Sequence, residues 1–126
     1  MSKYERPVVE IDAGMAEGVY AASGAGCYTV NARIHQTPEV GREDYRIQVD
    51  AVHNADHTNN AQTLTLSFNQ DVTYVSSQGT LASGQTGRVL VINYTYHNNE
   101  HENIGLGDVV VTSEAGLAIT GASMTD

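Results

Sequence analysis

The amino-acid sequence predicts an all-β protein built as an antiparallel sandwich of about seven or eight strands. Apolar and polar residues alternate in several short runs, as expected for strands with one face buried. Turn-forming residues separate these runs at short intervals, and no segment shows a helical period of useful length. This spacing of strands and turns is typical of immunoglobulin-like and jelly-roll sandwiches.

Composition limits the classes of partner. The chain has 126 residues, enough for one domain with its own core. Fifteen Asp and Glu residues stand against six Lys and Arg residues, which gives a formal net charge of −9. Such a surface repels phosphate backbones and anionic lipids, so we expect no nucleic-acid partner. No apolar run approaches the roughly 18 residues that a spanning helix needs, so we expect no membrane insertion.

Residues 1–26 differ from the rest and are predicted to form an N-terminal arm, whereas residues 27–126 form the sandwich domain. Residues 7–11 have the composition of an edge strand. The end of the arm resembles a double-glycine leader cut after Gly24-Ala25, which would make the protein secreted or attached to the cell surface. The alternative is an uncleaved strand packed on the domain, and a cytoplasmic location is left open.

The first two strands of the domain follow a period of two. Residues 28–34 place Tyr28, Val30, Ala32 and Ile34 on one face. A turn containing Pro38 and Gly41 leads to the next strand, at residues 45–51, so the two should form a hairpin. The later strands are predicted at residues 62–68, 72–75, 89–96, 108–112 and 117–120. Residues 69–71 should form a turn, and residues 76–87 a long connection with room for one short edge strand.

A polar motif, His-Asn-x-acid-His-x-Asn, occurs at residues 53–59 and again at residues 97–103. We name these segments the first and second His-Asn loops. Histidine and carboxylate side chains are ligand types for divalent metal ions, so the candidate metal ligands are His53, Asp56, His57, His97, Glu100 and His101. The alternatives are two turns without a ligand and a recognition loop for a sugar or a protein, because Asn and Asp favour turns. Apart from this possible metal, we expect no cofactor.

The number of strands between the two loops decides whether both lie at the same end of the sandwich and can contribute to one site. Counting strands 62–68, 72–75 and 89–96 as successive reversals places the second loop at the opposite end of the sandwich from the first. A site containing all four histidines would then be impossible within one molecule. The second loop also fits the H-x-x-E-H pattern of one metalloprotease class, but that pattern works on a helix. We interpret this match as chance.

Cys27 is the single cysteine, so the chain can form no internal disulfide. We expect it to pack as a small, inert apolar residue. Lipidation of Cys27 is excluded because acidic residues occupy the preceding segment, where a lipoprotein signal needs an apolar run.

The sequence resembles two groups of bacterial proteins. The region from Tyr28 to Asp126, with its Leu-Thr-Leu-Ser-Phe strand at residues 64–68 and Val-Thr-Tyr-Val-Ser-Ser at residues 72–77, resembles bacterial extracellular β-sandwich modules. These include carbohydrate-binding modules and immunoglobulin-like repeats of surface proteins. Residues 4–9 and 16–24 are similar to small uncharacterised proteins of clostridial gut anaerobes. The resemblance implies an extracellular binding module, although the tryptophans that grip cellulose are missing.

No catalytic motif is present: the chain has no G-x-S-x-G elbow, no phosphate-binding glycine loop and no Cys-x-x-Cys pair. We therefore expect a binding module and no enzyme. Glycan recognition is the first hypothesis, with candidate ring-stacking residues Tyr45, Tyr74, Tyr94 and Tyr96. Their periodicity equally predicts that they lie in the core. The second hypothesis is a structural, adhesion or assembly module that pairs with another protein chain through its N-terminal arm or an edge strand.

Overall fold

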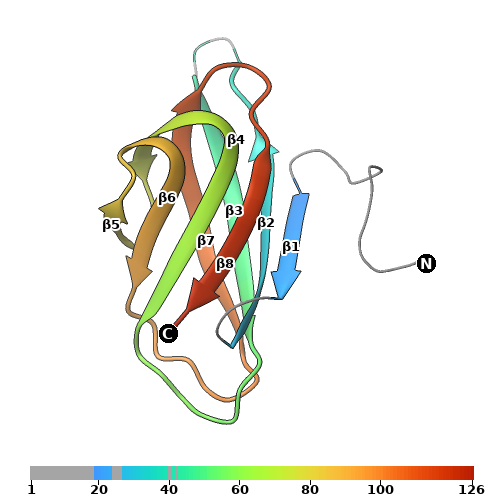
Figure 1. Cartoon of the computed structure of the whole chain (residues 1–126), viewed down its shortest axis with the longest axis vertical. Coiled ribbons are helices and arrows are strands. Elements are labelled where there is room, and N and C mark those ends of the chain that lie inside the picture. The colour runs from blue at the N-terminus through green and yellow to red at the C-terminus, as the bar shows by residue number, and fades with distance from the viewer. Residues whose placement is uncertain (1–18, 24–26, 40, 42) are drawn as a thin grey trace, which may run out of the picture.

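The computed structural model describes residues 19–23, 27–39, 41 and 43–126, and this part of the chain is all-β (Figure 1). Every strand pairing in it is antiparallel. In chain order, the strands are β1 (Val19–Ser23), β2 (Tyr28–Gln36), β3 (Asp44–His53), β4 (Gln62–Ser76), β5 (Thr80–Ser83), β6 (Thr86–Tyr94), β7 (Asn103–Ser113) and β8 (Ile119–Thr125). The predicted all-β sandwich is confirmed.

The strands form two facing layers, with β1, β2, β3 and β7 on one side and β8, β4, β6 and β5 on the other (Figure 1). One strand joins the layers. The first part of β4 pairs with β6 and β8, and its last residues pair with β7. The bend lies at the turn predicted for residues 69–71, where the Asn69 side chain accepts a hydrogen bond from Ala118 N at 2.8 Å. Hydrogen bonds therefore connect all eight strands into one sheet.

The predicted β2–β3 hairpin is present, with Val30 paired to Ala51 and Ala32 to Val49. β5 is the short edge strand for which residues 76–87 had room. β7 begins five residues earlier than predicted. Its early half carries Gly105 and Gly107 at exposed positions, where strand-forming side chains would normally give the signal. β8 begins two residues later than the predicted strand and continues to Thr125.

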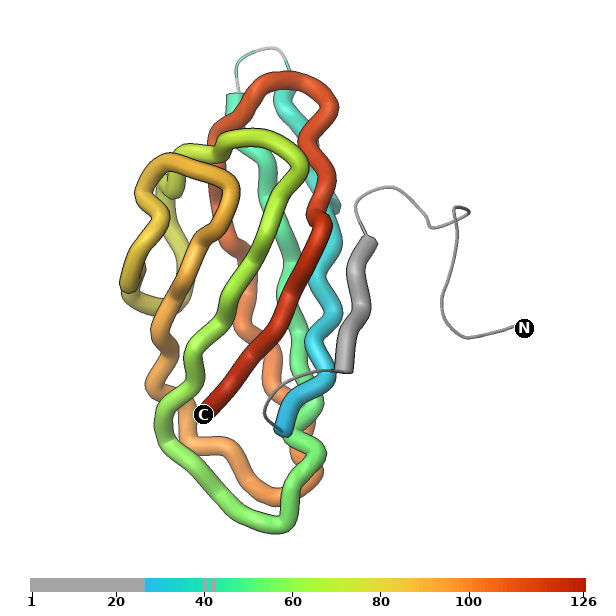
Figure 2. Tube along the Cα trace, in the orientation of Figure 1, coloured from blue at the N-terminus to red at the C-terminus, as the bar shows by residue number. Residues whose placement is uncertain are grey.

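The predicted placement of the two His-Asn loops at opposite ends is wrong. β5 adds one further reversal of the chain, so β6 runs toward the same end as β3. Both loops consequently lie together at one end of the sandwich, beside the C-terminal residue (Figure 2). A backbone bridge joins them, because Asn59 N and Asn98 N each donate to the other residue's carbonyl, at 3.0 and 2.8 Å.

One apolar core fills the space between the layers, and it includes Leu64, Leu66, Leu90, Ile92 and Leu106, all fully buried. Leu64 lies opposite Ile92 on β6 and Met124 on β8. We expect Leu64→Ala to lower the free energy of unfolding by about 2–5 kcal/mol, because it opens a cavity in a packed region. Urea denaturation measures this change. Thr65→Ala, on the opposite face, should cost less than about 1 kcal/mol, and an equal loss would contradict this core assignment.

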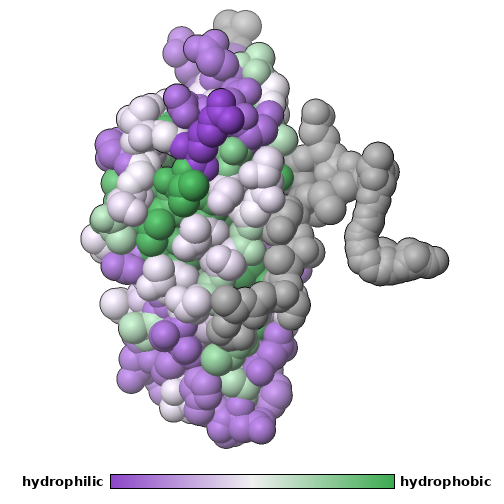
Figure 3. All heavy atoms as spheres, viewed as in Figure 1, coloured by the Kyte–Doolittle hydropathy of each residue, from purple (hydrophilic) through white to green (hydrophobic). Residues whose placement is uncertain are grey.

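The surface of the sandwich differs in hydropathy from one region to another. Hydrophilic side chains cover the end that carries the His-Asn loops, and apolar side chains gather over the middle of the front layer (Figure 3). Val75 and Val89 are the large apolar residues most exposed in the described part of the chain. No helix in this part is long and apolar enough to cross a membrane.

Five residues of the predicted arm form β1, which pairs with β2. The paired residues run from Val19 opposite Arg33 to Ser23 opposite Thr29. The edge strand predicted at residues 7–11 and the predicted leader cleavage after the pair Gly24-Ala25 lie outside the described residues.

Candidate metal centre

Four side chains converge at the end of the sandwich that carries both His-Asn loops. Cys27 immediately precedes β2, His53 ends β3, His57 lies in the first loop, and Asp126 follows β8. Their potential ligand atoms all lie within 4.8 Å of one another. Because β2 and β3 belong to one layer and β8 to the other, this cluster spans both layers.

The distances within the cluster suit a four-ligand metal site. Asp126 Oδ2 lies 2.9 Å from His57 Nε2 and 3.5 Å from His53 Nε2. Cys27 Sγ lies 3.7 Å from His57 Nε2 and 3.6 Å from Asp126 Oδ2. Tetrahedral Zn²⁺ places its ligands about 2.0–2.3 Å from the ion, hence about 3.3–3.8 Å from one another. The four distances are close to these values, so the four ligand atoms need to move only a little to surround one ion.

Packing and a hydrogen bond fix the orientation of the His53 ring, as is common for histidines that bind metal ions. Its side chain is fully buried, and its ring stacks on Tyr28 with centroids 4.8 Å apart. Its Nδ1 lies 3.0 Å from the Asn99 carbonyl, which can only accept, so Nδ1 carries the proton. The other ring nitrogen, Nε2, then presents its lone pair to the cluster. Metal-binding histidines are commonly oriented by such a hydrogen bond from the non-ligating nitrogen.

The second His-Asn loop supports the cluster without entering it. It supplies the Asn99 carbonyl that orients His53, and its buried residue Asn98 directs its side-chain amide at the Tyr28 hydroxyl, 3.4 Å away. His101 Nε2 lies 2.7 Å from Asp56 Oδ1, next to His57 in the sequence. The two similar motifs thus have different roles, since the first provides ligands and the second holds the first in place.

Protonation and geometry in the cluster argue against nucleophilic catalysis. A hydrogen bond from His57 lowers the pKa of Asp126, so this carboxylate is ionised at neutral pH. Burial, and then the Asp126 charge, raise the pKa of the Cys27 thiol, which is the opposite of what an activated nucleophile needs. Cys27 and Asp126 also approach the same nitrogen of His57. In a catalytic triad, nucleophile and carboxylate bond to different nitrogens of the histidine.

His57 completes the set from the solvent side. Its side chain is 52% exposed, and its Nε2 donates to Asp126 Oδ2. Coordination through Nε2 requires that proton to leave, and the exposed ring can carry a proton on Nδ1 instead. A metal ion would thus have a soft thiolate, two imidazoles and a carboxylate as donors. Zn²⁺ accepts all three donor types.

The chain matches no protein-family model, and no curated protein matches its sequence.

The other predicted metal ligands are not part of the cluster. Asp56 and His101 pair with each other, and His97 Nδ1 bonds to Asn60 Oδ1 at 2.6 Å. Glu100 is exposed in the second loop. Cys27 packs partly buried against the apolar core, as predicted, but its sulfur also lies 3.7 Å from His57 Nε2 and 3.6 Å from Asp126 Oδ2. The sequence did not predict these polar contacts, and the inertness of Cys27 stays a prediction. Asp126 was not predicted from the sequence.

The four candidate tyrosines are buried to different degrees. Tyr45 and Tyr94 are 4% and 2% exposed and belong to the core. Tyr74 and Tyr96 are partly buried and pack against it. Tyr94 and Tyr96 lie close together, with ring centroids 5.8 Å apart. Tyr45 and Tyr94 are therefore too deeply buried to stack on a sugar, whereas the rings of Tyr74 and Tyr96 remain partly exposed.

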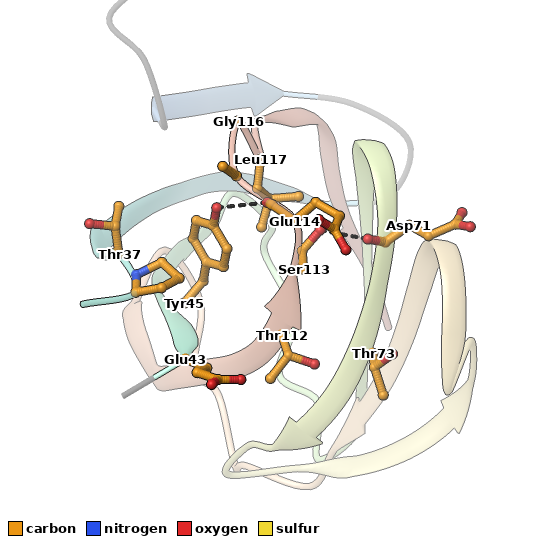
Figure 4. Close-up of a pocket in the computed structure, with 12 residues that line it drawn as sticks. Thr37, Glu43, Tyr45, Asp71, Thr73, Thr112, Ser113, Glu114, Gly116 and Leu117 are labelled. Atoms are coloured by element: carbon orange, nitrogen blue, oxygen red, sulfur yellow. Dashed lines mark hydrogen bonds between the residues drawn. The ribbon is translucent and has the colours of Figure 1, made fainter. Parts of the chain in front are cut away.

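An open cavity of about 990 Å³ lies at the opposite end of the sandwich (Figure 4). The start of β3, the bend of β4 and the β7–β8 turn surround it. Tyr45 lines this cavity, but its hydroxyl is used in donating to the Glu114 carbonyl at 2.8 Å. Hydroxyl and carboxylate side chains form much of the remaining wall, among them Thr73, Thr112 and Glu43.

Proposed function

We propose that this domain is a metal-binding β-sandwich module that holds one divalent transition-metal ion, with Zn²⁺ as the best match. Cys27 Sγ, His53 Nε2, His57 Nε2 and an oxygen of Asp126 would be its ligands. The ion would neutralise the thiolate and the carboxylate and would join the ends of the two layers. We assign it no catalytic role.

The observation that carries this proposal is the convergence of four donor atoms within 4.8 Å from four separate segments of the chain. Exposed acidic residues often gather without binding a metal, but this cluster includes a fully buried histidine. His53 Nε2 lies 3.5 Å from Asp126 Oδ2, and its other ring nitrogen, Nδ1, is bonded to the Asn99 carbonyl. Metal-ligating histidines almost always have such a supporting hydrogen bond, so this arrangement supports the proposal.

Titration with Co²⁺, followed by displacement with Zn²⁺, tests the proposal. A tetrahedral site with one thiolate should give intense visible absorption bands and a sulfur-to-cobalt charge-transfer band in the near ultraviolet at one ion per chain. Zn²⁺ should abolish both and raise the melting temperature through its preference for the folded state. Cys27→Ser should remove the charge-transfer band.

His35→Ala is the matched control. His35 also pairs with an aspartate, Asp108, at 2.9 Å, but on the outer face of β2. This variant should keep the wild-type spectrum and stoichiometry. Absence of saturable Co²⁺ and Zn²⁺ binding by the wild-type chain would end the proposal.

Glycan recognition is supported by a separate feature, the cavity at the far end. Its volume is that of a small-molecule site, and its hydroxyl and carboxylate groups can bond to sugar hydroxyls. The metal proposal has the stronger support, because its donor atoms meet at one point and are oriented by a second layer of hydrogen bonds.

A further inference from the structure

We propose that Asn59, the last residue of the first His-Asn loop, sets the metal affinity by competing with the ion for His53. This inference rests on the proposed metal-binding function. The Asn59 amide nitrogen lies 3.3 Å from His53 Nε2 and 2.9 Å from Asp126 Oδ2, two of the four ligand atoms. It also lies 2.6 Å from the Tyr28 hydroxyl, so its two N–H groups are shared among three acceptors, of which His53 Nε2 is the most distant.

A chain of hydrogen bonds fixes the orientation of this amide. The buried side chain of Gln62 accepts from Tyr96 N at 3.2 Å and donates to the Tyr96 carbonyl at 2.6 Å. These two backbone groups determine which end of the Gln62 amide carries the nitrogen. That nitrogen also donates to Asn59 Oδ1 at 2.7 Å. With its oxygen directed at Gln62, Asn59 must present its NH₂ group to the cluster.

The competition centres on His53 Nε2. An imidazole nitrogen has a single lone pair, which either accepts a hydrogen from Asn59 or binds a metal. Asp126 differs, since a carboxylate has enough lone pairs to accept from Asn59 and to bind an ion. Metal binding at His53 Nε2 therefore excludes hydrogen-bond donation from Asn59 to the same nitrogen. Asn59 places a weak positive dipole where the ion would be, which stabilises the ligand set when no metal is bound.

Removal of this donor should strengthen metal binding. We expect Asn59→Ala to lower the dissociation constants for Zn²⁺ and Co²⁺ about three- to tenfold, the size of one ordinary hydrogen bond. Its melting temperature without metal should fall. Asn59→Asp keeps the acceptor for Gln62 but places a second carboxylate near Asp126. It should bind more tightly still, and be less stable without metal.

Asn54→Ala is the matched control, because Asn54 is in the same loop but donates to Thr29 Oγ1 at 2.6 Å, away from the cluster. Its affinity should equal that of the wild type. In the wild-type chain, the Asn59 side-chain amide resonances should shift when Zn²⁺ is added, which tests the exchange without any substitution. The backbone pairing of residue 59 with Asn98 does not depend on the side chain.

The outcomes separate this inference from the proposed function. If the wild type binds metal and Asn59→Ala binds it equally or more weakly, Asn59 only supports the loop and the inference is overturned. Unchanged Asn59 amide resonances in the zinc-bound wild type would overturn it as well. If the wild type binds neither ion, the proposed function fails and this inference fails with it.

Discussion

Replacing His53 with alanine should weaken Zn²⁺ binding at least about a hundredfold, because it removes the one fully buried ligand of the cluster. It should also lower the free energy of unfolding without metal by about 2–4 kcal/mol, since the ring is fully buried, stacks on Tyr28 and bonds to Asn99. Isothermal titration calorimetry measures the first effect, and urea denaturation in the presence of a chelator measures the second.

His97→Ala provides the comparison within the second His-Asn loop. His97 occupies the position equivalent to His53 in the motif, but it is exposed and bonds to Asn60 and Asn99. Its removal should change Zn²⁺ affinity less than about threefold, because it contacts no ligand. Equal losses of affinity in both variants would mean that the two loops contribute alike, contrary to the geometry.

The burial of His53, which sets it apart from the other candidate ligands, could have been predicted from the sequence. The inward residues of β3 are Tyr45, Ile47, Val49 and Ala51, and the next position in this period of two is His53. The strand period therefore predicts that His53 is buried, whereas the equivalent histidine of the second loop, His97, is exposed. The same period on β8 leads from Ala122 through Met124 to Asp126. In the sequence, His53 and Asp126 each look like the end of an ordinary strand. Only the arrangement of the strands in the fold shows that the two side chains meet in one cluster.

The assembly of the cluster depends on strand order, which local patterns do not determine. Cys27 and Asp126 are 99 residues apart in the sequence and meet because β2 and β8 belong to facing layers. The direction of β6 depended on β5, a four-residue edge strand with mostly exposed side chains and no clear alternation. Omitting this strand reversed the predicted position of the second loop. The periodicity of the sequence was enough to predict the fold class. Prediction of the site would also have required the order and direction of the strands.

Metal affinity should rise about tenfold per pH unit between about pH 7 and pH 9. Burial and the adjacent Asp126 charge raise the pKa of the Cys27 thiol above its ordinary value, so more of this thiol keeps its proton in this range than a free cysteine would. A metal ion binds the thiolate and must displace that proton, which becomes easier as the pH rises.

Competition with a chelator of known pH dependence measures this slope, and Cys27→Ser tests its origin. A serine hydroxyl stays protonated in this range, so the variant should bind weakly and with an affinity that is nearly independent of pH. Asp126→Asn should keep the slope while lowering the affinity, because an ionised carboxylate releases no proton. A wild-type affinity that stayed constant from about pH 7 to pH 9 would show that no thiol proton is displaced. In that case Cys27 would be excluded as a ligand and the site reduced to its two histidines and one carboxylate.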